Sequence, residues 1–183
     1  MENMKFIGMA VFLITAVACG KKQQHNEPAE FPDNWKKYEN KDYRIHYPDT
    51  FDLNTSGFMG FDFILFSKAT SLDDKFIENI GLMKQNLKHS GISMNQFVEL
   101  SETQISEMIT DVDIIESKRV KKGNLEYHKL IYTSRQGKSD LKTMQYYFLE
   151  NEIAYVLNFT SEEDQFDNYI NDSIEIMDSF VVK

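Results

Sequence analysis

Cys19 is the only cysteine of this 183-residue chain, and its thiol is a nucleophile that can accept a covalently attached lipid. An apolar stretch, residues 6–18, comes directly before it and follows Lys5. At about 13 residues, this stretch fits the apolar region of a signal peptide and is too short to cross a bilayer as a helix. We therefore predict that residues 1–18 are a signal peptide and that Cys19 is the site of lipid attachment.

The three residues before this cysteine, Ala16-Val17-Ala18, resemble the lipobox of bacterial lipoproteins, although Ala16 stands where that family prefers Leu. The resemblance implies cleavage before Cys19, acylation with palmitate-type chains, and anchoring of the chain to a membrane of the bacterial cell envelope, on the periplasmic or the outer side. Two alternatives remain: an ordinary secretory signal that happens to end near a cysteine, and a retained membrane anchor.

The four histidines (His25, His46, His89 and His128) are widely spaced, whereas zinc ligands commonly come in closely spaced pairs. We therefore predict no metal site. Motifs of serine hydrolases, zinc proteases and nucleotide-binding loops are also missing from the sequence. A catalytic triad assembled from distant residues stays open as an alternative. We expect no catalytic residue and no cofactor.

Charged residues form short clusters. The acidic ones, Asp73-Asp74, Asp111 with Asp113, and residues 162–164, lack the glycine that turns a calcium loop and are interpreted as solvated turns and helix ends. The basic cluster, Lys118-Arg119 and Lys121-Lys122, is expected at a hairpin tip. There it protects a sheet edge or, alternatively, docks to anionic lipid headgroups or an acidic partner. The net charge of −9 disfavours nucleic-acid binding.

Phe58-Met59-Gly60-Phe61 is the segment best suited to bind a ligand. Its glycine permits a mobile loop, and Phe58 and Phe61 could line a pocket for a small apolar molecule. Packing of these rings in the core, next to a hairpin, is the alternative interpretation.

Hydrophobic residues make up 42% of the chain and aromatic residues 13%, which is enough for one packed domain. Residues 20–34 are polar and contain Pro28 and Pro32, so we predict a flexible tether over residues 19–34 and a domain over residues 35–183. Alternation of apolar residues with period two predicts strands in this domain. They are Tyr43–Pro48, Phe61–Phe66, Ile80–Gln85, Leu125–Arg135, Leu141–Glu150 and Ile153–Thr160.

Two helices are expected between and after these strands. Ser93 and Gln96 form a capping box ahead of an apolar stripe that runs to Ile109, and a second stripe runs from Phe166 to Phe180. Strand Ile153–Thr160 is apolar on both faces, so we place it in the middle of a sheet that is covered on both sides. The predicted fold class is α+β, an antiparallel sheet flanked by helices.

Several short segments occur in an order that is similar to a known fold. They are residues 43–48 (YRIHYP), 78–80 (ENI), 95–97 (NQF), 145–147 (QYY), 154–160 (AYVLNFT) and 179–180 (SF). Together they resemble the PsbP fold family, which includes the photosystem II subunit PsbP and DcrB-type bacterial lipoproteins. The resemblance implies a PsbP-like α/β sandwich and accessory or assembly roles in larger complexes, without a shared catalytic apparatus.

From these observations we expect a lipid-anchored, non-catalytic envelope protein that acts as an interaction or assembly module with a protein partner. The alternatives are a carrier of a small apolar ligand held near Phe58–Phe61 and, third, a hydrolytic enzyme. A closed core with an exposed apolar patch would favour the module, whereas a deep apolar cavity would favour the carrier.

Overall fold

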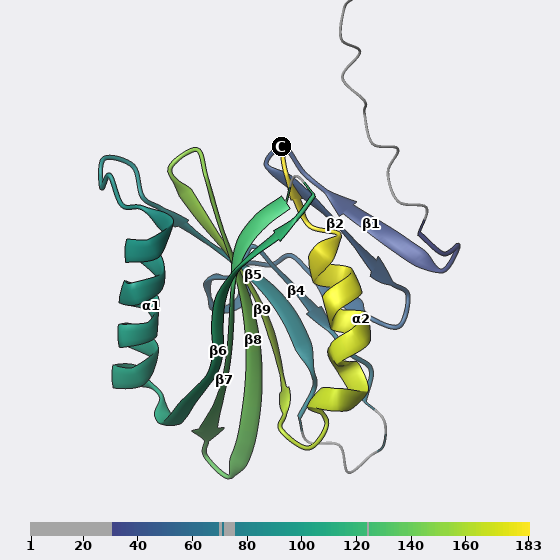
Figure 1. The fold of residues 1–183 in the computed structure, drawn as a ribbon. Helices are drawn as coiled ribbons and strands as arrows, with labels where there is room; N and C mark the ends of the chain where they lie inside the picture. Colours follow the sequence, from purple (N-terminus) through teal and green to yellow (C-terminus); the bar gives the residue numbers. More distant parts are fainter. Residues whose placement is uncertain (1–30, 70, 72–75, 124) are drawn as a thin grey trace, which may run out of the picture. The chain divides into compact units, whose positions relative to one another are not determined.

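Two antiparallel sheets and two helices form residues 31–183, the part of the chain that the computed structural model describes apart from residues 70, 72–75 and 124 (Figure 1). Within that part, the larger sheet has the strand order β3-β4-β5-β9-β8-β7-β6. Its strands are β3 (Asp52–Asn54), β4 (Phe63–Phe66), β5 (Asn79–Asn86), β6 (Thr110–Lys122), β7 (Leu125–Gln136), β8 (Ser139–Glu150) and β9 (Ile153–Glu162). The predicted antiparallel α+β class is confirmed.

A smaller sheet consists of β1 (Trp35–Glu39), β2 (Tyr43–Pro48) and β10 (Val181–Val182), with β2 in the middle. The described helices are α1 (Met94–Met108), α2 (Phe166–Asp178) and the short 3-10 helix η1 (Phe58–Gly60). None of the described helices is long and apolar enough to cross a membrane.

Strand β9 lies between β5 and β8, in the middle of the larger sheet, as its apolar faces predicted. Tyr155 and Leu157 point into the core that α2 covers, together with three residues of β2. Ala154 and Val156 point to the opposite face, where α1 packs. The small sheet therefore shares the core on the α2 side, and the core on the α1 side is formed by α1, the larger sheet and the segment that joins β5 to α1.

Helix α1 begins where the capping box predicted. The Ser93 hydroxyl accepts a hydrogen bond from the backbone N–H of Gln96, whose side-chain oxygen accepts one from the backbone N–H of Ser93. Phe97, Val98 and Ile105 are buried. The predicted stripe is wrong at its end, because Met108 is 81% exposed and the helix stops before Ile109.

The predicted stripe faces the core, with Phe166 and Met177 on α2 and Phe180 two residues beyond the end of the helix. Its N-cap is Gln165, and no side chain caps it. Ser161, which precedes the helix in the sequence, lies within β9 and is fully buried. The strand continues to Glu162, two residues further than its apolar pattern indicated.

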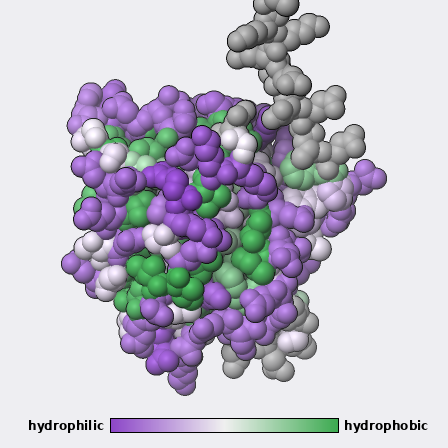
Figure 2. All heavy atoms as spheres, viewed as in Figure 1, coloured by the Kyte–Doolittle hydropathy of each residue, from purple (hydrophilic) through white to green (hydrophobic). Residues whose placement is uncertain are grey.

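Strand β6 was not anticipated from the sequence. It is a 13-residue outer strand that pairs with β7 and contains two register shifts. The basic cluster of residues 118–122 forms the end of this strand and reaches the turn of the β6–β7 hairpin, where Lys122 pairs with Leu125, and it occupies a sheet edge. Figure 2 shows apolar side chains gathered between the two helices on this side of the molecule. Among the apolar residues of β6, Ile115 is 54% exposed.

Packing of the described domain begins upstream of Trp35. The ring of Phe31 stacks on the ring of Trp35 and on that of His46 in β2. The backbone N–H of Trp35 donates to the carbonyl of Pro32, and the N–H of Asp49 donates to that of Asn34. Residues 31–34, assigned to the tether from the sequence, therefore contact the domain.

Candidate functional site: a groove beside helix α1

Helix α1 covers only part of its face of the larger sheet. It contacts β6 and β8, and the neighbouring residues of β5 and β9 on the same face remain accessible. Met83 of β5 is 43% exposed and Val156 of β9 is partly buried. Sequence alternation places these residues on the face opposite to the α2 core. A groove therefore runs beside α1, and strands β8 and β9 form its floor.

Three cross-strand pairs of β8 and β9 form this floor. They are Thr143 with Thr160, Gln145 with Asn158, and Tyr147 with Val156. Successive pairs are two residues apart, which is about 6.6 Å along the strands. We call this surface, with the α1 residues Phe97, Ser101 and Ile105 on one side and Met83 on the other, the α1 groove.

A directional chain of hydrogen bonds joins the polar side chains of the floor. The Tyr147 hydroxyl donates to Oε1 of Gln145, whose Nε2 donates to Oδ1 of Asn158 at 2.9 Å. Nδ2 of Asn158 then donates to the hydroxyl of Thr160 at 2.8 Å, which is 3.4 Å from that of Thr143. Each side-chain amide therefore keeps one N–H and one oxygen lone pair for a further partner.

Two hollows lie over this floor. One, of about 390 Å³, lies between the middle of α1 and Met83, and Gln145, Tyr147 and Val156 line it. The other, of about 480 Å³, lies at the C-terminal end of α1, and Asn158 and Thr160 line it. The hydrogen bond between Gln145, in the first hollow, and Asn158, in the second, connects the floors of the two hollows. Both volumes lie in the range of small-ligand and peptide-residue pockets.

The charged residues that border these hollows are Lys84 and Arg135, and both are already paired. Arg135 binds Asp140 at 2.8 Å and Asp111 at 3.4 Å. Lys84 projects to the opposite face of β5 and binds Asp62 at 2.7 Å. The groove thus offers amides, hydroxyls and apolar walls, and no free charge from the residues that line it.

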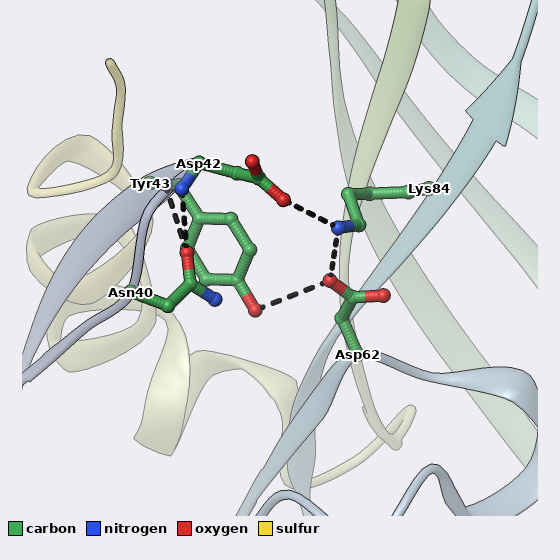
Figure 3. Close-up of polar contacts among 5 residues, drawn as sticks. All are labelled: Asn40, Asp42, Tyr43, Asp62 and Lys84. Carbon is green, nitrogen blue, oxygen red and sulfur yellow. Dashed lines mark hydrogen bonds and ion pairs between the residues drawn. The ribbon is translucent and has the colours of Figure 1, made fainter.

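Lys84 joins the two sheets on the α2 side (Figure 3). Its ammonium contacts Asp62, ahead of β4, and Asp42, 3.1 Å away in the β1–β2 turn. Burial alone would lower the pKa of Lys84, but the hydrogen bonds to Asp62 and Asp42 outweigh it and the pKa rises. The turn itself is held by Asn40, whose side-chain oxygen accepts the N–H groups of Asp42 and Tyr43.

The Tyr43 hydroxyl donates to the same Asp62 carboxylate at 3.4 Å, and the ring is fully buried (Figure 3). Burial raises the pKa of Tyr43, and the negative charge of Asp62 adds to the shift. The phenol stays protonated as a donor, and this cluster fixes the small sheet to the larger one.

A serine and a histidine meet on the α1 face, at the outer strands. Ser117 Oγ lies 2.9 Å from Nε2 of His128 and 2.5 Å from a carboxylate oxygen of Glu102 on α1. In a catalytic triad the carboxylate binds the other imidazole nitrogen, whereas here it contacts the serine. Burial, followed by the charge of Arg119, lowers the pKa of His128. This arrangement joins α1 to β6 and β7.

Phe58 and Phe61, which were predicted to line one ligand pocket, have different surroundings. Phe58 lies in η1 and is 56% exposed. The Phe61 ring instead packs on Gly81 of β5, where an added Cβ would lie 2.5 Å from the ring. Gly81 pairs with Asn158, so Phe61 lies one strand away from the polar floor of the α1 groove. The predicted lipid site, Cys19, is outside the described residues.

Of the histidines, His25 lies outside the described residues, and His46, His89 and His128 lie on separate elements. In the part of the chain that is described, no three His, Cys, Asp or Glu side chains come together to hold a metal ion.

The groove residues were missed as a site because the sequence analysis treated their segments as parts of the fold. Gln145 and Asn158 occur in the motifs QYY and AYVLNFT. The available signal was an amide at the centre of each of two strands whose neighbouring residues are apolar. A buried or half-buried amide needs a partner, and here the two amides partner one another.

No protein-family profile and no curated protein sequence matches the chain, whereas several solved structures share its fold. A Pseudomonas aeruginosa protein of unknown function matches with TM-score 0.59 and 10% identity, over 82% of this chain and 98% of that one. Cyanobacterial PsbP from Synechocystis matches with TM-score 0.58 and 14% identity, over 85% and 96%.

LpqN, described as involved in cell envelope biogenesis of Mycobacterium tuberculosis, matches with TM-score 0.57 and 8% identity, over 82% of this chain and 92% of its own. At these identities the likeness concerns the fold. Together with the strand order and the two helices on opposite faces, it confirms the resemblance recognised in the sequence: residues 31–183 have a PsbP-like fold.

Proposed function

We propose that this chain is a membrane-anchored, non-catalytic module of the bacterial cell envelope that binds a partner protein in the α1 groove. The observation that carries the proposal is the polar part of the floor, Gln145, Asn158 and Thr160, whose paired side chains α1 leaves partly exposed. A sheet face that had only to support the fold would be covered by a helix or carry isolated solvated side chains.

The envelope location is supported by the lipobox-like segment before Cys19 and by the fold shared with LpqN. Anchoring through an acylated Cys19 would hold the domain near a bilayer on the tether of residues 19–30.

The non-catalytic role is supported by the chemistry of the groove. Its floor consists of amides, hydroxyls and Tyr147, and the charged residues at its border are held in ion pairs. General acid–base catalysis needs a titratable group free to exchange protons near the working pH. Such floors suit recognition instead, because they offer hydrogen bonds in fixed positions.

The first experiment places a photo-crosslinking amino acid at Met83, in the wall of the groove, in living cells. The control position is Asn171, exposed on α2 on the other side of the sheet. We expect a discrete crosslinked product from Met83 and none from Asn171. Equal products from both positions, or none from either, would refute the groove as the binding surface.

The second experiment tests the anchor separately. Cys19→Ser removes the only thiol, so palmitate labelling should be lost and the uncleaved precursor should accumulate. Labelling that survives the substitution would refute anchoring at Cys19 without affecting the groove.

A further inference from the structure

The floor of the α1 groove has the hydrogen-bonding complement of a peptide backbone. After the internal bonds are formed, Gln145 keeps one N–H and one oxygen lone pair, and so does Asn158. One residue of an extended chain offers the same set, because its own N–H and C=O point to the same side of the chain. A side-chain amide can therefore pair with the backbone of one residue through two hydrogen bonds.

The spacing of the floor matches an extended chain. The three cross-strand pairs recur every second residue of β8 and β9, so floor contacts repeat at about 6.6 Å. Residues of an extended peptide that face the same side repeat at the same distance. In Figure 1, α1 runs along the direction of these strands, so a peptide lying beside the helix would follow the floor.

The charge of the groove differs from that of the molecule. The chain carries a net charge of −9, yet the residues that line the two hollows include no acidic side chain, and their cations Lys84 and Arg135 are neutralised by nearby aspartates. A charged ligand would lose water here without gaining a counter-charge. An uncharged ligand loses less and can use the apolar walls at Phe97, Ile105 and Met83.

The length of the groove sets the size of the ligand. From Thr143 to Tyr147 the floor extends for four residue steps, about 13 Å, and an extended segment of about five residues fits along it. Met83 and Met108, at 43% and 81% exposure, lie at its borders and supply flexible apolar contacts to the ligand side chains.

We propose that the α1 groove binds an uncharged, extended peptide segment of about five residues from a partner protein, with the amides of Gln145 and Asn158 pairing to its backbone. The inference rests on the proposed function and adds the chemistry of the bound segment. Recognition of backbone groups leaves the sequence of the segment free, provided that its side chains are neutral and partly apolar.

The test uses the full chain in detergent micelles and a library of random peptides displayed on phage. We expect enrichment of peptides with an uncharged core of small and apolar residues. For a selected peptide made synthetically, Asn158→Leu and Gln145→Met should each raise the Kd by about tenfold, because each removes a pair of hydrogen bonds. Asn171→Leu on the exposed face of α2 is the matched control and should leave the Kd unchanged.

A second measurement leaves the protein intact. N-methylation of alternate backbone nitrogens of the same peptide should abolish binding, because it removes the donors that the amides accept. Enrichment of charged peptides, or binding that tolerates both N-methylation and Asn158→Leu, would overturn the inference. If Met83 crosslinks a partner in cells through a folded, helical surface of that partner, the peptide inference fails while the proposed function stands. If Met83 crosslinks nothing, the proposed function fails.

Discussion

Phe31 and His46 stack with ring centroids 4.1 Å apart and an angle of 15° between their planes. Phe31 precedes β1 and His46 lies in β2, so the contact fixes the start of the described chain to the small sheet. Nδ1 of His46 is buried and has no hydrogen-bond partner, which gives this imidazole an environment that favours its neutral form.

Burial, followed by the charges of Arg44 and Lys37, lowers the pKa of His46 below its usual 6.5. The unfolded chain therefore binds more protons, so the stability from the neutral ring is present above pH 6.5 and is lost as the pH falls through the lower pKa of the folded state. We expect the urea concentration at the unfolding midpoint to decrease when the pH is lowered from 7.5 to 5.5. In His46→Phe, this dependence of the midpoint on pH should be weaker.

Phe31→Ala provides the control for this cause. It exposes the imidazole, so the pKa of His46, followed by NMR, should move up towards 6.5. Glu39 does not contribute to the pH dependence between pH 7.5 and 5.5, because hydrogen bonds to Lys183 and Lys37 lower its pKa to about 2. An unchanged slope in His46→Phe would contradict the assignment.

Leu157→Ala tests the central position of β9. Leu157 is fully buried in the core under α2, so its truncation should leave a cavity and lower the free energy of unfolding by about 2–5 kcal/mol. Val156→Ala, one residue away on the groove face, should cost about 1 kcal/mol because that side chain is already partly exposed. Equal shifts of the urea midpoint would contradict the placement of the two faces.

Gly81→Ala tests the contact beneath Phe61. The new methyl group would lie 2.5 Å from the Phe61 ring, so the ring must move and the variant should lose about 1–3 kcal/mol. Phe61→Ala combined with Gly81→Ala should cost less than the sum of the single changes, since the clash needs both side chains. Additive losses in a double-mutant cycle would show that the backbone at Gly81 causes the effect.

Lys84→Met tests the ionic link between the sheets. It leaves Asp42 and Asp62 close together without a cation, and we expect a loss of about 1–3 kcal/mol. Asp62→Asn in the same chain should recover part of it, because one uncompensated charge disappears. In the native chain the pKa of Lys84 is raised above its ordinary value of 10.5, so its contribution is fully present below that value and is lost as the pH rises through the raised pKa. A Lys84→Met chain as stable as the native one would refute the link.

Most of the fold could be predicted from local patterns. The alternation in β2, β5 and β7–β9 and the capping box at Ser93 were sufficient because tertiary packing agrees with them. Strand β6 could not be found in this way, because its burial alternates weakly and charged residues occupy both of its faces at the sheet edge. The short outer strands β1 and β10 bury few side chains and give equally little signal.

The candidate site was less accessible to prediction. Gln145 and Asn158 are visible in the sequence, but their pairing requires the register of β8 and β9. To predict that they are accessible, one must know that α1 packs over β6 and β8. That position depends on the tertiary packing of the helix rather than on its own residues. Phe58 and Phe61 were predicted to bind a ligand because they are aromatic, whereas in the structure the Phe61 ring covers Gly81.

The last residues of the chain complete the small sheet. Val181 and Val182 pair with Arg44 and Tyr43 of β2, and the backbone N–H of Lys183 donates to the carbonyl of Asp42. About 140 residues of sequence separate these partners, so the pairing is among the most non-local contacts of the described fold. Strand β10 therefore covers an edge of β2 whose backbone N–H and C=O groups would otherwise be open to pairing with another chain.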